Sequence, residues 1–285
     1  MKYRLLALDL DGTLLGPDHR VSPANRAALA DAHDAGVAVI PCTGRGWRES
    51  LNALADVPNL ELGVFNTGAV VVEMDTGHAV DLADLEPHLA LELVEFLRDL
   101  PEAVLVFQEH GRTGRDFLVT GDGAVTDNTK RWFAMNRLLV EENRHPTPDD
   151  LRHSLRVGVV ATGRHAFDVE EQVVERFGHR VYLHCFAGVP TAKKEDAVFI
   201  VEVFARGVNK WRGLTWIAEQ RGIVAHEIAA VGDEINDLAM LREAGLGVAM
   251  ANAVPAAAEA ADVTTASNHD DGVAHAIRQM LDGEW

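Results

Sequence analysis

The stretch Leu8-Asp9-Leu10-Asp11-Gly12-Thr13 places two carboxylates two residues apart, directly after an apolar segment at residues 3–8. The apolar segment predicts a buried β-strand, and alternation along an extended backbone directs Asp9 and Asp11 to the same side. Two close carboxylates repel each other unless a cation or a proton lies between them, and Mg²⁺ prefers such hard oxygen ligands. The stretch therefore predicts a divalent cation site at the end of this strand, with an acidic, solvent-facing loop as the alternative.

A second acidic cluster follows another apolar segment late in the chain, in Val231-Gly232-Asp233-Glu234-Ile235-Asn236-Asp237. If Asp237 opens a helix, Asp233 and Asp237 can both face one loop, although Asp237 could instead simply cap that helix. Sites in parallel α/β sheets form at the carboxyl ends of the strands. Two acid clusters, each placed directly after a strand, therefore favour one shared site over two unrelated solvated turns.

Two further segments carry groups that can bind phosphate. Cys42-Thr43-Gly44-Arg45 follows an expected strand at residues 37–41, and it offers a hydroxyl and free N–H groups at the start of a helix. Lys210 would supply a compact positive charge, although a single lysine is weak evidence outside this series of motifs. No base is evident beside Cys42, so we expect a buried thiol and not a nucleophile.

Strands and helices alternate at both ends of the chain, which predicts an α/β fold: a Rossmann-like parallel-sheet core with helices on both faces. Between these ends, hairpin-like strand pairs mixed with helices predict an inserted α+β module with an antiparallel sheet. We expect the core in residues 1–82 and 206–285 and the module in residues 83–205. Expected strands include residues 64–65, 104–108, 116–120, 155–161, 181–186, 198–204, 228–231, 246–249 and 263, and expected helices include residues 23–35, 87–100, 129–140, 165–177, 210–221, 237–244, 254–260 and 272–281.

Composition narrows the classes of function. The chain has 285 residues, of which 47% are hydrophobic and 25% charged, as in ordinary globular proteins. No apolar run approaches the roughly 20 residues of a membrane helix, and no signal-peptide pattern is present, so we expect a cytoplasmic protein without a membrane partner. The net charge of −18 argues against nucleic acid but not against a small phosphorylated substrate. The 13 histidines lack zinc-ligand spacing.

Four short motifs occur in the order Asp9 with Asp11, Thr43, Lys210, and Asp233 with Asp237. In this order they resemble the motifs of the haloacid dehalogenase superfamily. Residues 232–240, 247–253 and 268–274 resemble its Cof-type branch, and Asn66-Thr67-Gly68-Ala69 is similar to the Asn-Gly-Ala turn of that branch, with Thr67 inserted or substituted. The inserted module resembles the large class IIB cap. The resemblance spans essentially the whole chain, but it is specific in the core and only topological in the cap.

The resemblance implies roles for the acids and the lysine. Asp9 would be the nucleophile and a Mg²⁺ ligand. Asp11 would be the general acid and then the general base, with its backbone carbonyl on the metal. Asp233 would ligate Mg²⁺ directly or through water, and Asp237 would support both the metal and Lys210.

The resemblance also implies a substrate-binding set. Thr43 and Lys210 would bind the transferring phosphoryl group. The chain departs from the family at Trp211, where glycine often follows the lysine, so the approach of the substrate could differ. Arg45 and Arg212 could contact the leaving group, with surface salt bridges as an equal alternative for both. The other expected contacts are Gly44, Asn66, Thr67, Gly68 and Asn236, and candidate cap residues are His110, Arg112, Arg115, Lys130, His184, Lys193 and Lys194.

We therefore expect a Mg²⁺-dependent phosphatase that hydrolyses a small phosphorylated metabolite, with sugar phosphates first, through an aspartyl-phosphate on Asp9. Alternatives are a phosphomutase or another phosphotransferase on the same core, and a metal-dependent binding protein without turnover. A receiver-like module would use a similar acid cluster but would not need the large insertion. The sequence leaves a monomer and a homodimer open.

Overall fold

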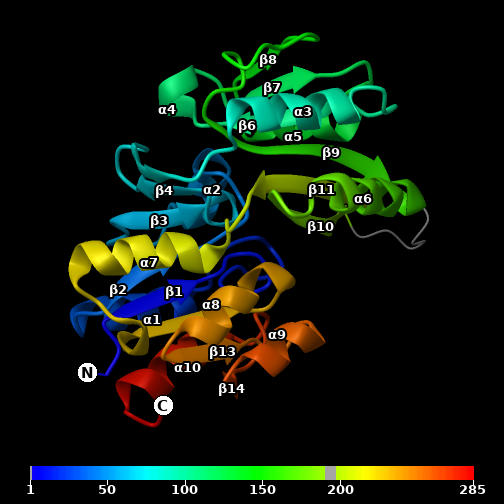
Figure 1. The fold of residues 1–285 in the computed structure, drawn as a ribbon. Helices are drawn as coiled ribbons and strands as arrows, with labels where there is room; N and C mark the ends of the chain where they lie inside the picture. Colours follow the sequence, from blue (N-terminus) through cyan, green and yellow to red (C-terminus); the bar gives the residue numbers. More distant parts are fainter. Residues whose placement is uncertain (1, 190–196) are drawn as a thin grey trace. The chain divides into compact units, whose positions relative to one another are not determined.

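The computed structural model describes residues 2–189 and 197–285, which fall into two compact units (Figure 1). Unit 1 combines Met1–Asp81 with Asn209–Trp285, and unit 2 is the continuous segment Leu82–Val208. The chain of unit 1 is therefore interrupted once, one to three residues from the boundaries expected from the sequence. Within the described residues, no helix has the length and apolar character needed to cross a membrane.

Unit 1 contains a parallel sheet in which β1 lies between β2 and β12. Leu8 at the end of β1 is level with Pro41 on one neighbour and Val231 on the other, so the loops after these three strands begin at the same edge. This confirms the predicted α/β class with a parallel-sheet core. The strands, in the order β14-β13-β12-β1-β2, are β1 (Leu5–Leu8), β2 (Ala38–Pro41), β12 (Ile228–Gly232), β13 (Leu246–Ala249) and β14 (Val263–Thr264).

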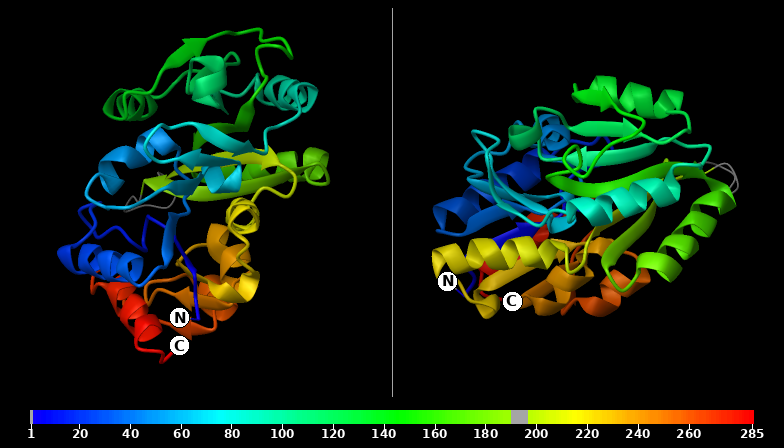
Figure 2. Two further views of the ribbon diagram at one scale, coloured as in Figure 1. Left: turned by 90° about the vertical axis from the view of Figure 1, so that its left-hand side faces the viewer. Right: turned by 45° about the horizontal axis from the view of Figure 1, so that its top comes forward.

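Helices cover both faces of this sheet because the residues of β1 alternate between two apolar clusters. Leu6 and Leu8 pack in the cluster under α1 and α10, whereas Leu5 and Ala7 pack in the cluster under α7. Helices α1 and α10 lie side by side at the blue and red ends of the chain (Figure 2). The helices are α1 (Pro23–Asp34), α2 (Trp47–Leu54), α7 (Lys210–Arg221), α8 (Leu238–Glu243), α9 (Pro255–Ala260) and α10 (Gly272–Leu281), with short 3₁₀ turns η3 (Ala225–Glu227) and η4 (Ile235–Asp237).

One strand of unit 1 belongs to a different sheet from the one expected. β3 (Leu62–Phe65) contacts the parallel sheet through an isolated bridge between Cys42 and Val64, and it pairs antiparallel with β4 (Val70–Glu73). β5 (Ala79–Leu82) completes this second sheet in the order β3-β4-β5. The sequence analysis missed β4 and β5, because short apolar runs that follow a turn directly carry little periodicity.

Unit 2 is an α+β unit whose sheet has the order β10-β11-β9-β6-β7-β8. Among the described strands of this sheet, neighbours are antiparallel except for β7 and β8, which are parallel. Helices α3 and α6 share an apolar cluster with the middle strands of this sheet. The elements are α3 (Pro87–Leu97), β6 (Val104–Gln108), α4 (His110–Thr113), β7 (Phe117–Thr120), α5 (Asp127–Met135), β8 (Val140–Glu142), β9 (Ser154–Thr162), α6 (Gly163–Phe177), β10 (Val181–Val189) and β11 (Val198–Ala205).

The helix expected at residues 129–140 is shorter than predicted. It ends at Met135, and Arg137 takes the left-handed conformation with φ 53°, which stops a right-handed helix. Val140 then begins strand β8. Of the apolar residues that suggested a continuing helix, Val140 belongs to this edge strand, whereas Leu138 and Leu139 lie in the segment that connects α5 to it.

Candidate active site

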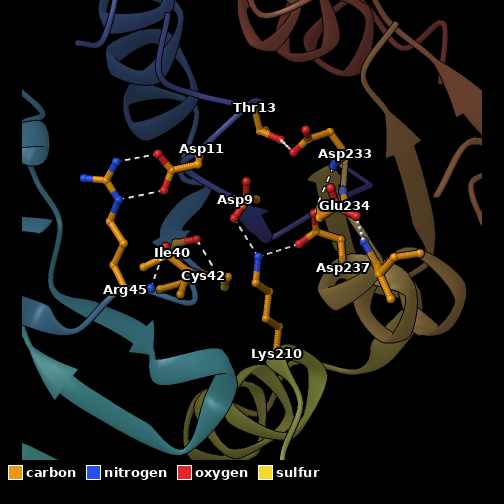
Figure 3. Close-up of polar contacts among 12 residues, drawn as sticks. Asp9, Asp11, Thr13, Ile40, Cys42, Arg45, Lys210, Asp233, Glu234 and Asp237 are labelled. Carbon is orange, nitrogen blue, oxygen red and sulfur yellow. Dashed lines mark hydrogen bonds and ion pairs between the residues drawn. The ribbon is translucent and has the colours of Figure 1, made fainter. Parts of the chain in front are cut away.

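The nucleophile candidate lies at the end of the central strand. Asp9 follows β1 directly and its backbone N–H donates to the carbonyl of Val231 at 3.1 Å, so that its side chain is held at the shared edge of the sheet. Only 5% of Asp9 is exposed. Its Oδ1 accepts a hydrogen bond from the ammonium of Lys210 at 2.6 Å (Figure 3). A residue 201 positions away in sequence therefore pairs with Asp9.

Lys210 is fully buried at the start of α7, where the side chain of Asn209 caps the helix by accepting from the N–H of Arg212. Its ammonium donates to Asp9 and also to Asp237 Oδ1 at 2.6 Å. Trp211 packs against the apolar cluster under α7. The departure from the family pattern at Trp211 therefore leaves Lys210 directed at the two carboxylates.

Asp237 organises the second acid cluster. Its Oδ2 accepts hydrogen bonds from the backbone N–H groups of Asp233 at 2.9 Å and Glu234 at 3.0 Å, while Oδ1 binds Lys210. The side chain is fully buried. Asp237 precedes α8, but its side chain makes no capping hydrogen bond to that helix. The alternative that Asp237 simply caps the helix is therefore wrong: one oxygen orders the preceding turn and the other binds the lysine.

Asp233 is held by the loop that follows Asp9. The hydroxyl of Thr13 donates to Asp233 Oδ1 at 2.9 Å. Gly12 has φ +79°, and a Cβ there would lie 2.1 Å from Asp233 Oδ2, so that only glycine permits this approach. Sequence reasoning missed the contact of Thr13, although a hydroxyl directly after the Asp-Gly turn was the signal for it.

Asp9, Asp233 and Asp237 each offer a carboxylate oxygen to one small space, where these atoms all lie within 4.8 Å of one another. Lys210 supplies one positive charge to these three carboxylates, which leaves an excess of negative charge when all are ionised. Hard oxygen donors at this spacing suit a divalent cation such as Mg²⁺. The side chains present therefore fit the metal that the sequence predicts.

The electrostatics follow from burial and from this excess charge. Burial, against the attraction of Lys210, raises the pKa of Asp9 well above its ordinary value. Burial and the neighbouring Asp237 raise the pKa of Asp233 to about 7. Burial alone would lower the pKa of Lys210, but the Asp237 and Asp9 carboxylates outweigh it and raise that pKa. The lysine thus stays protonated, and the acids lack sufficient positive charge.

Asp11 does not join this group, contrary to the expected alternation. Its carboxylate is half exposed and binds the guanidinium of Arg45, with Arg45 Nε 2.6 Å from Asp11 Oδ2 and Arg45 Nη2 on Asp11 Oδ1 (Figure 3). The extended strand ends at Leu8 and the chain then turns, as the bridge between Asp11 and Leu15 shows. Period-two alternation therefore no longer applies at Asp11.

The turn after β3 holds the loop that follows β2. The N–H groups of Asn66 and Thr67 donate to the carbonyls of Arg45 at 2.9 Å and Thr43 at 3.0 Å. Asn66 and Thr67, with φ of 48° and 57°, keep left-handed conformations that are costly for residues other than glycine. These residues form η1 (Asn66–Gly68), which orders the Thr43 loop.

Thr67 and Asn236 surround the backbone of Gly44. The Cβ that Gly44 lacks would lie 3.5 Å from both Thr67 Oγ1 and Asn236 Nδ2. The Thr67 hydroxyl and the Asn236 Oδ1 are buried and have no hydrogen-bond partner within the described residues. Thr43 Oγ1 accepts from the N–H of Arg45 at 3.1 Å, so its hydroxyl proton remains available. Thr67 and Asn236, two of the expected substrate contacts, therefore lie beside Gly44 and the adjacent Thr43.

Arg212 contacts the η1 turn at Gly68. It donates to the carbonyl of Gly68 at 3.3 Å and forms an ion pair with Asp81. Gly68 has φ +98°, and a Cβ there would lie 1.9 Å from the carbonyl oxygen of Asn209. The absence of a side chain at Gly68 therefore lets η1 contact the residue that precedes Lys210.

The candidate cap residues are engaged locally within unit 2. Arg115, for example, donates to Gln108 Oε1 at 2.6 Å and pairs with Glu141, and His184 is buried. His110, Arg112 and Lys130 are near Asp116, Glu109 and Asp127, respectively. Lys193 and Lys194 lie outside the described residues.

Both cysteines lie in apolar runs, which predicts two buried thiols, and the structure confirms burial for Cys42 but only in part for Cys185. Cys42 is buried, and burial raises the pKa of its thiol, which opposes a reactive thiolate. Cys185 is only partly buried, and burial raises its pKa to about 12.

Comparison with known proteins identifies the family. A family model of haloacid dehalogenase-like hydrolases matches residues 6–277. The 5-amino-6-(5-phospho-D-ribitylamino)uracil phosphatase YitU of Bacillus subtilis is 31% identical over 284 residues, covering 98% of each chain. An HMP-PP phosphatase of Cronobacter sakazakii is 27% identical over 252 residues, covering 88% of this chain and 85% of the relative. The solved structure of the subclass IIB sugar phosphatase BT4131 shares the fold, with a TM-score of 0.75, 21% identity and coverage of 98% and 99%. The chain belongs to the haloacid dehalogenase-like hydrolase family and is a phosphatase of that family.

Proposed function

We propose that the protein is a Mg²⁺-dependent phosphatase that hydrolyses a small phosphorylated metabolite through an aspartyl-phosphate on Asp9. The observation that carries the proposal is the convergence of Asp9, Asp233 and Asp237 on the single ammonium of Lys210. This group combines a nucleophile candidate with a fixed cation and with further carboxylates that invite a second cation. Phosphoryl transfer depends mainly on such positioning and charge stabilisation.

Asp9 and Asp233 would hold the metal, with support from Asp237 and from the backbone carbonyl of Asp11. When bound, Mg²⁺ would offset the repulsion between a carboxylate and a phosphate, which is about 4 kcal/mol per charge pair at about 4 Å and an effective dielectric near 20. Lys210 contributes a positive charge of its own through its hydrogen bond to Asp9 Oδ1. The proposed metal set uses oxygen donors throughout, as Mg²⁺ requires.

The chemical steps fall to two aspartates. A carboxylate oxygen of Asp9 would form a bond to phosphorus as the bond between phosphorus and the ester oxygen breaks, and Asp11 would protonate that leaving oxygen. Asp11 would then take a proton from water, which attacks phosphorus and releases phosphate and free Asp9. The first proton transfer requires Arg45 to release the carboxyl group that it binds in this structure.

The transferring phosphoryl group would be bound by Thr43, Lys210 and the backbone around Gly44. The buried hydroxyl of Thr67 and the amide of Asn236, which border Gly44, support this assignment because both carry polar atoms that a ligand could satisfy. We assign Arg45 to the leaving group once it has released Asp11. Asn66, Gly68 and Arg212 would act by shaping this turn.

For the substrate we propose a sugar phosphate or a related small phosphate ester. The similar proteins support this class, since they are named for a ribityl phosphate compound, for HMP-PP and for sugar phosphates. We assign selection of the leaving group to unit 2, Leu82–Val208, which would act as the cap domain. Its inserted position and its separate apolar core support an independent role.

The test is phosphate release from p-nitrophenyl phosphate, followed by a panel of phosphorylated metabolites, with wild type and Asp9→Asn compared in Mg²⁺ and in chelator. We expect turnover by wild type with Mg²⁺ alone and a loss of about a thousandfold or more in Asp9→Asn. Isomerised substrate without free phosphate would instead identify a mutase. Binding of phosphate esters without any turnover would identify a metal-dependent binding protein and end the proposal.

A further inference from the structure

Three asparagine side chains join the loop after Asp9 to residues 268–274, which comprise the start of α10 and the segment before it. Asn252 Nδ2 donates to the carbonyl of Gly12 at 2.8 Å, and Asn252 Oδ1 accepts from the N–H of Asn268 at 2.9 Å. Asn268 Nδ2 donates to the carbonyl of Leu15 at 2.9 Å. Residues 252 and 268 lie in the C-terminal motifs that resemble the Cof-type branch, and the mechanism above gives them no role.

The third asparagine makes the same kind of bridge inside the core. Asn25 is 1% exposed, and its Nδ2 donates to the carbonyl of Leu14 at 3.4 Å while Oδ1 accepts from the N–H of Ala274 at 2.9 Å. We call Asn25, Asn252 and Asn268 the asparagine clamp. Its members bind three carbonyls within residues 12–15 and connect them to residues 268–274.

The chemistry of the amide explains why asparagine stands at these positions. Asn25 and Asn252 each donate to a loop carbonyl and accept from a C-terminal N–H through one planar group. A carboxylate of the same shape can only accept, so aspartate would oppose the loop carbonyl with a second oxygen. These contacts therefore depend on the amide and not only on the size of the side chain.

The clamped loop is the one that holds Asp233. Thr13 donates to Asp233 Oδ1 at 2.9 Å, and the Cα of Gly12 packs so closely against this carboxylate that a Cβ would lie 2.1 Å from Oδ2. On the inner side, Leu14 and Leu15 are buried in the apolar cluster under α1 and α10. Without the asparagines, the segment that contains Gly12 and Thr13 would lose these hydrogen bonds to the C-terminal segment and keep only the apolar packing of Leu14 and Leu15.

We propose that the asparagine clamp is a positioning element of the phosphatase site. It holds Gly12 and Thr13 against Asp233 and fixes the backbone on which Asp11 is placed. The proposal rests on the proposed function, because its effect is read through the reaction. The clamp residues act through the loop and do not themselves contact the reacting atoms, so their loss lowers turnover and loosens the metal site while substrate affinity is retained.

The test compares Asn252→Ala, Asn268→Ala and Asn252→Asp with Asn52→Ala, a matched control at an exposed asparagine of α2. The measurements are kcat, KM, the Mg²⁺ concentration for half-maximal activity, and Tm. We expect kcat to fall about tenfold to a hundredfold in the alanine variants, because small displacements of reacting groups cost this much. KM should stay within about twofold, the Mg²⁺ requirement should rise severalfold, and Asn252→Asp should be no better than Asn252→Ala.

Other outcomes overturn the proposal. If kcat in the clamp variants matches the Asn52→Ala control, or if Tm falls while kcat and the Mg²⁺ requirement stay unchanged, the clamp is structural only. Asn268→Ala keeps its backbone N–H contact with Asn252 and serves as the test if the Asn252 variants do not fold. An inactive wild type would refute the proposed function itself, whereas an active wild type with unaffected variants refutes the clamp alone.

Discussion

Three buried or half-buried acids share one lysine ammonium at the carboxyl edge of the parallel sheet. Burial raises the pKa of Asp9 and of Asp233, which means that the metal-free site favours bound protons over full ionisation. The sequence predicted these residues because both acid pairs follow apolar strands directly. It could not predict the direction of Asp11, which depends on the turn after Leu8 and on the contact with Arg45.

The raised pKa of Asp233 gives a pH dependence of stability. Its ordinary pKa is 3.8 and its value in the folded protein is about 7, so the folded state binds the proton more tightly than the unfolded state. The contribution of Asp233 to the free energy of unfolding is therefore fully present below about pH 4 and is lost as the pH rises through about 7. Mg²⁺ binds the ionised carboxylates and should reverse this loss. We therefore expect Mg²⁺ to raise Tm more at about pH 8 than at about pH 5.

Differential scanning fluorimetry with and without Mg²⁺ across this range measures the effect. Asp233→Asn is the control. Its amide does not titrate, so the increase in Tm caused by Mg²⁺ should depend less on pH, with the raised pKa of Asp9 accounting for the remainder. An increment as large at about pH 5 as at about pH 8 would show that the ion binds elsewhere.

Among the elements, the turn η1 links the separate strand-end motifs. It binds the carbonyls of Thr43 and Arg45 and also contacts Asn209, the cap of the helix that begins with Lys210. The sequence analysis identified residues 66–69 by resemblance but missed the sheet that continues from them. Local patterns identify a strand or a cap, whereas the partner of a turn that crosses between distant segments depends on the complete fold.

Gly68→Ala should therefore lower activity more than the strain of a left-handed backbone at residue 68 alone would. The added Cβ meets the Asn209 carbonyl and should shift Lys210 away from Asp9, lowering kcat about tenfold or more. Gly36→Ala is the matched control, with φ +84° and no atom within 4 Å of the new Cβ. Both variants should lose about 1–2 kcal/mol of unfolding free energy from the left-handed backbone.

Chemical denaturation and steady-state kinetics on the two variants separate strain from displacement. Equal kcat values in Gly68→Ala and Gly36→Ala would mean that the contact between η1 and Asn209 does not position the lysine.

At the scale of the whole molecule, alternation of strands and helices predicts a discontinuous core, and the chain forms two compact units, of which Leu82–Val208 is continuous. The interruption is visible in the sequence because hairpin-like strand pairs replace single strands between helices. The length of α5 was overestimated, since the left-handed Arg137 and the pairing of β8 with β7 depend on tertiary contacts. A salt bridge was one expectation for Arg212, but its partner Asp81 had no signal in the sequence.

Unit 2 has a continuous chain and its own apolar cluster, so it should fold without unit 1. We expect the isolated segment 82–208 to unfold cooperatively and to release no phosphate, because the acids and Lys210 all belong to unit 1. Circular dichroism during thermal unfolding tests this expectation. A segment that shows no cooperative transition would indicate that unit 2 requires unit 1 for its fold.

The most direct test of the account is to locate the phosphoryl group during turnover. In Asp11→Asn, p-nitrophenyl phosphate should still phosphorylate Asp9, because its leaving group needs no proton, while hydrolysis lacks its base and slows. Quenching and borohydride reduction convert an aspartyl-phosphate into homoserine, which mass spectrometry locates in the peptide. The account predicts homoserine at position 9 with substrate and Mg²⁺, and none in chelator. A phosphoryl group trapped on any other residue would contradict it.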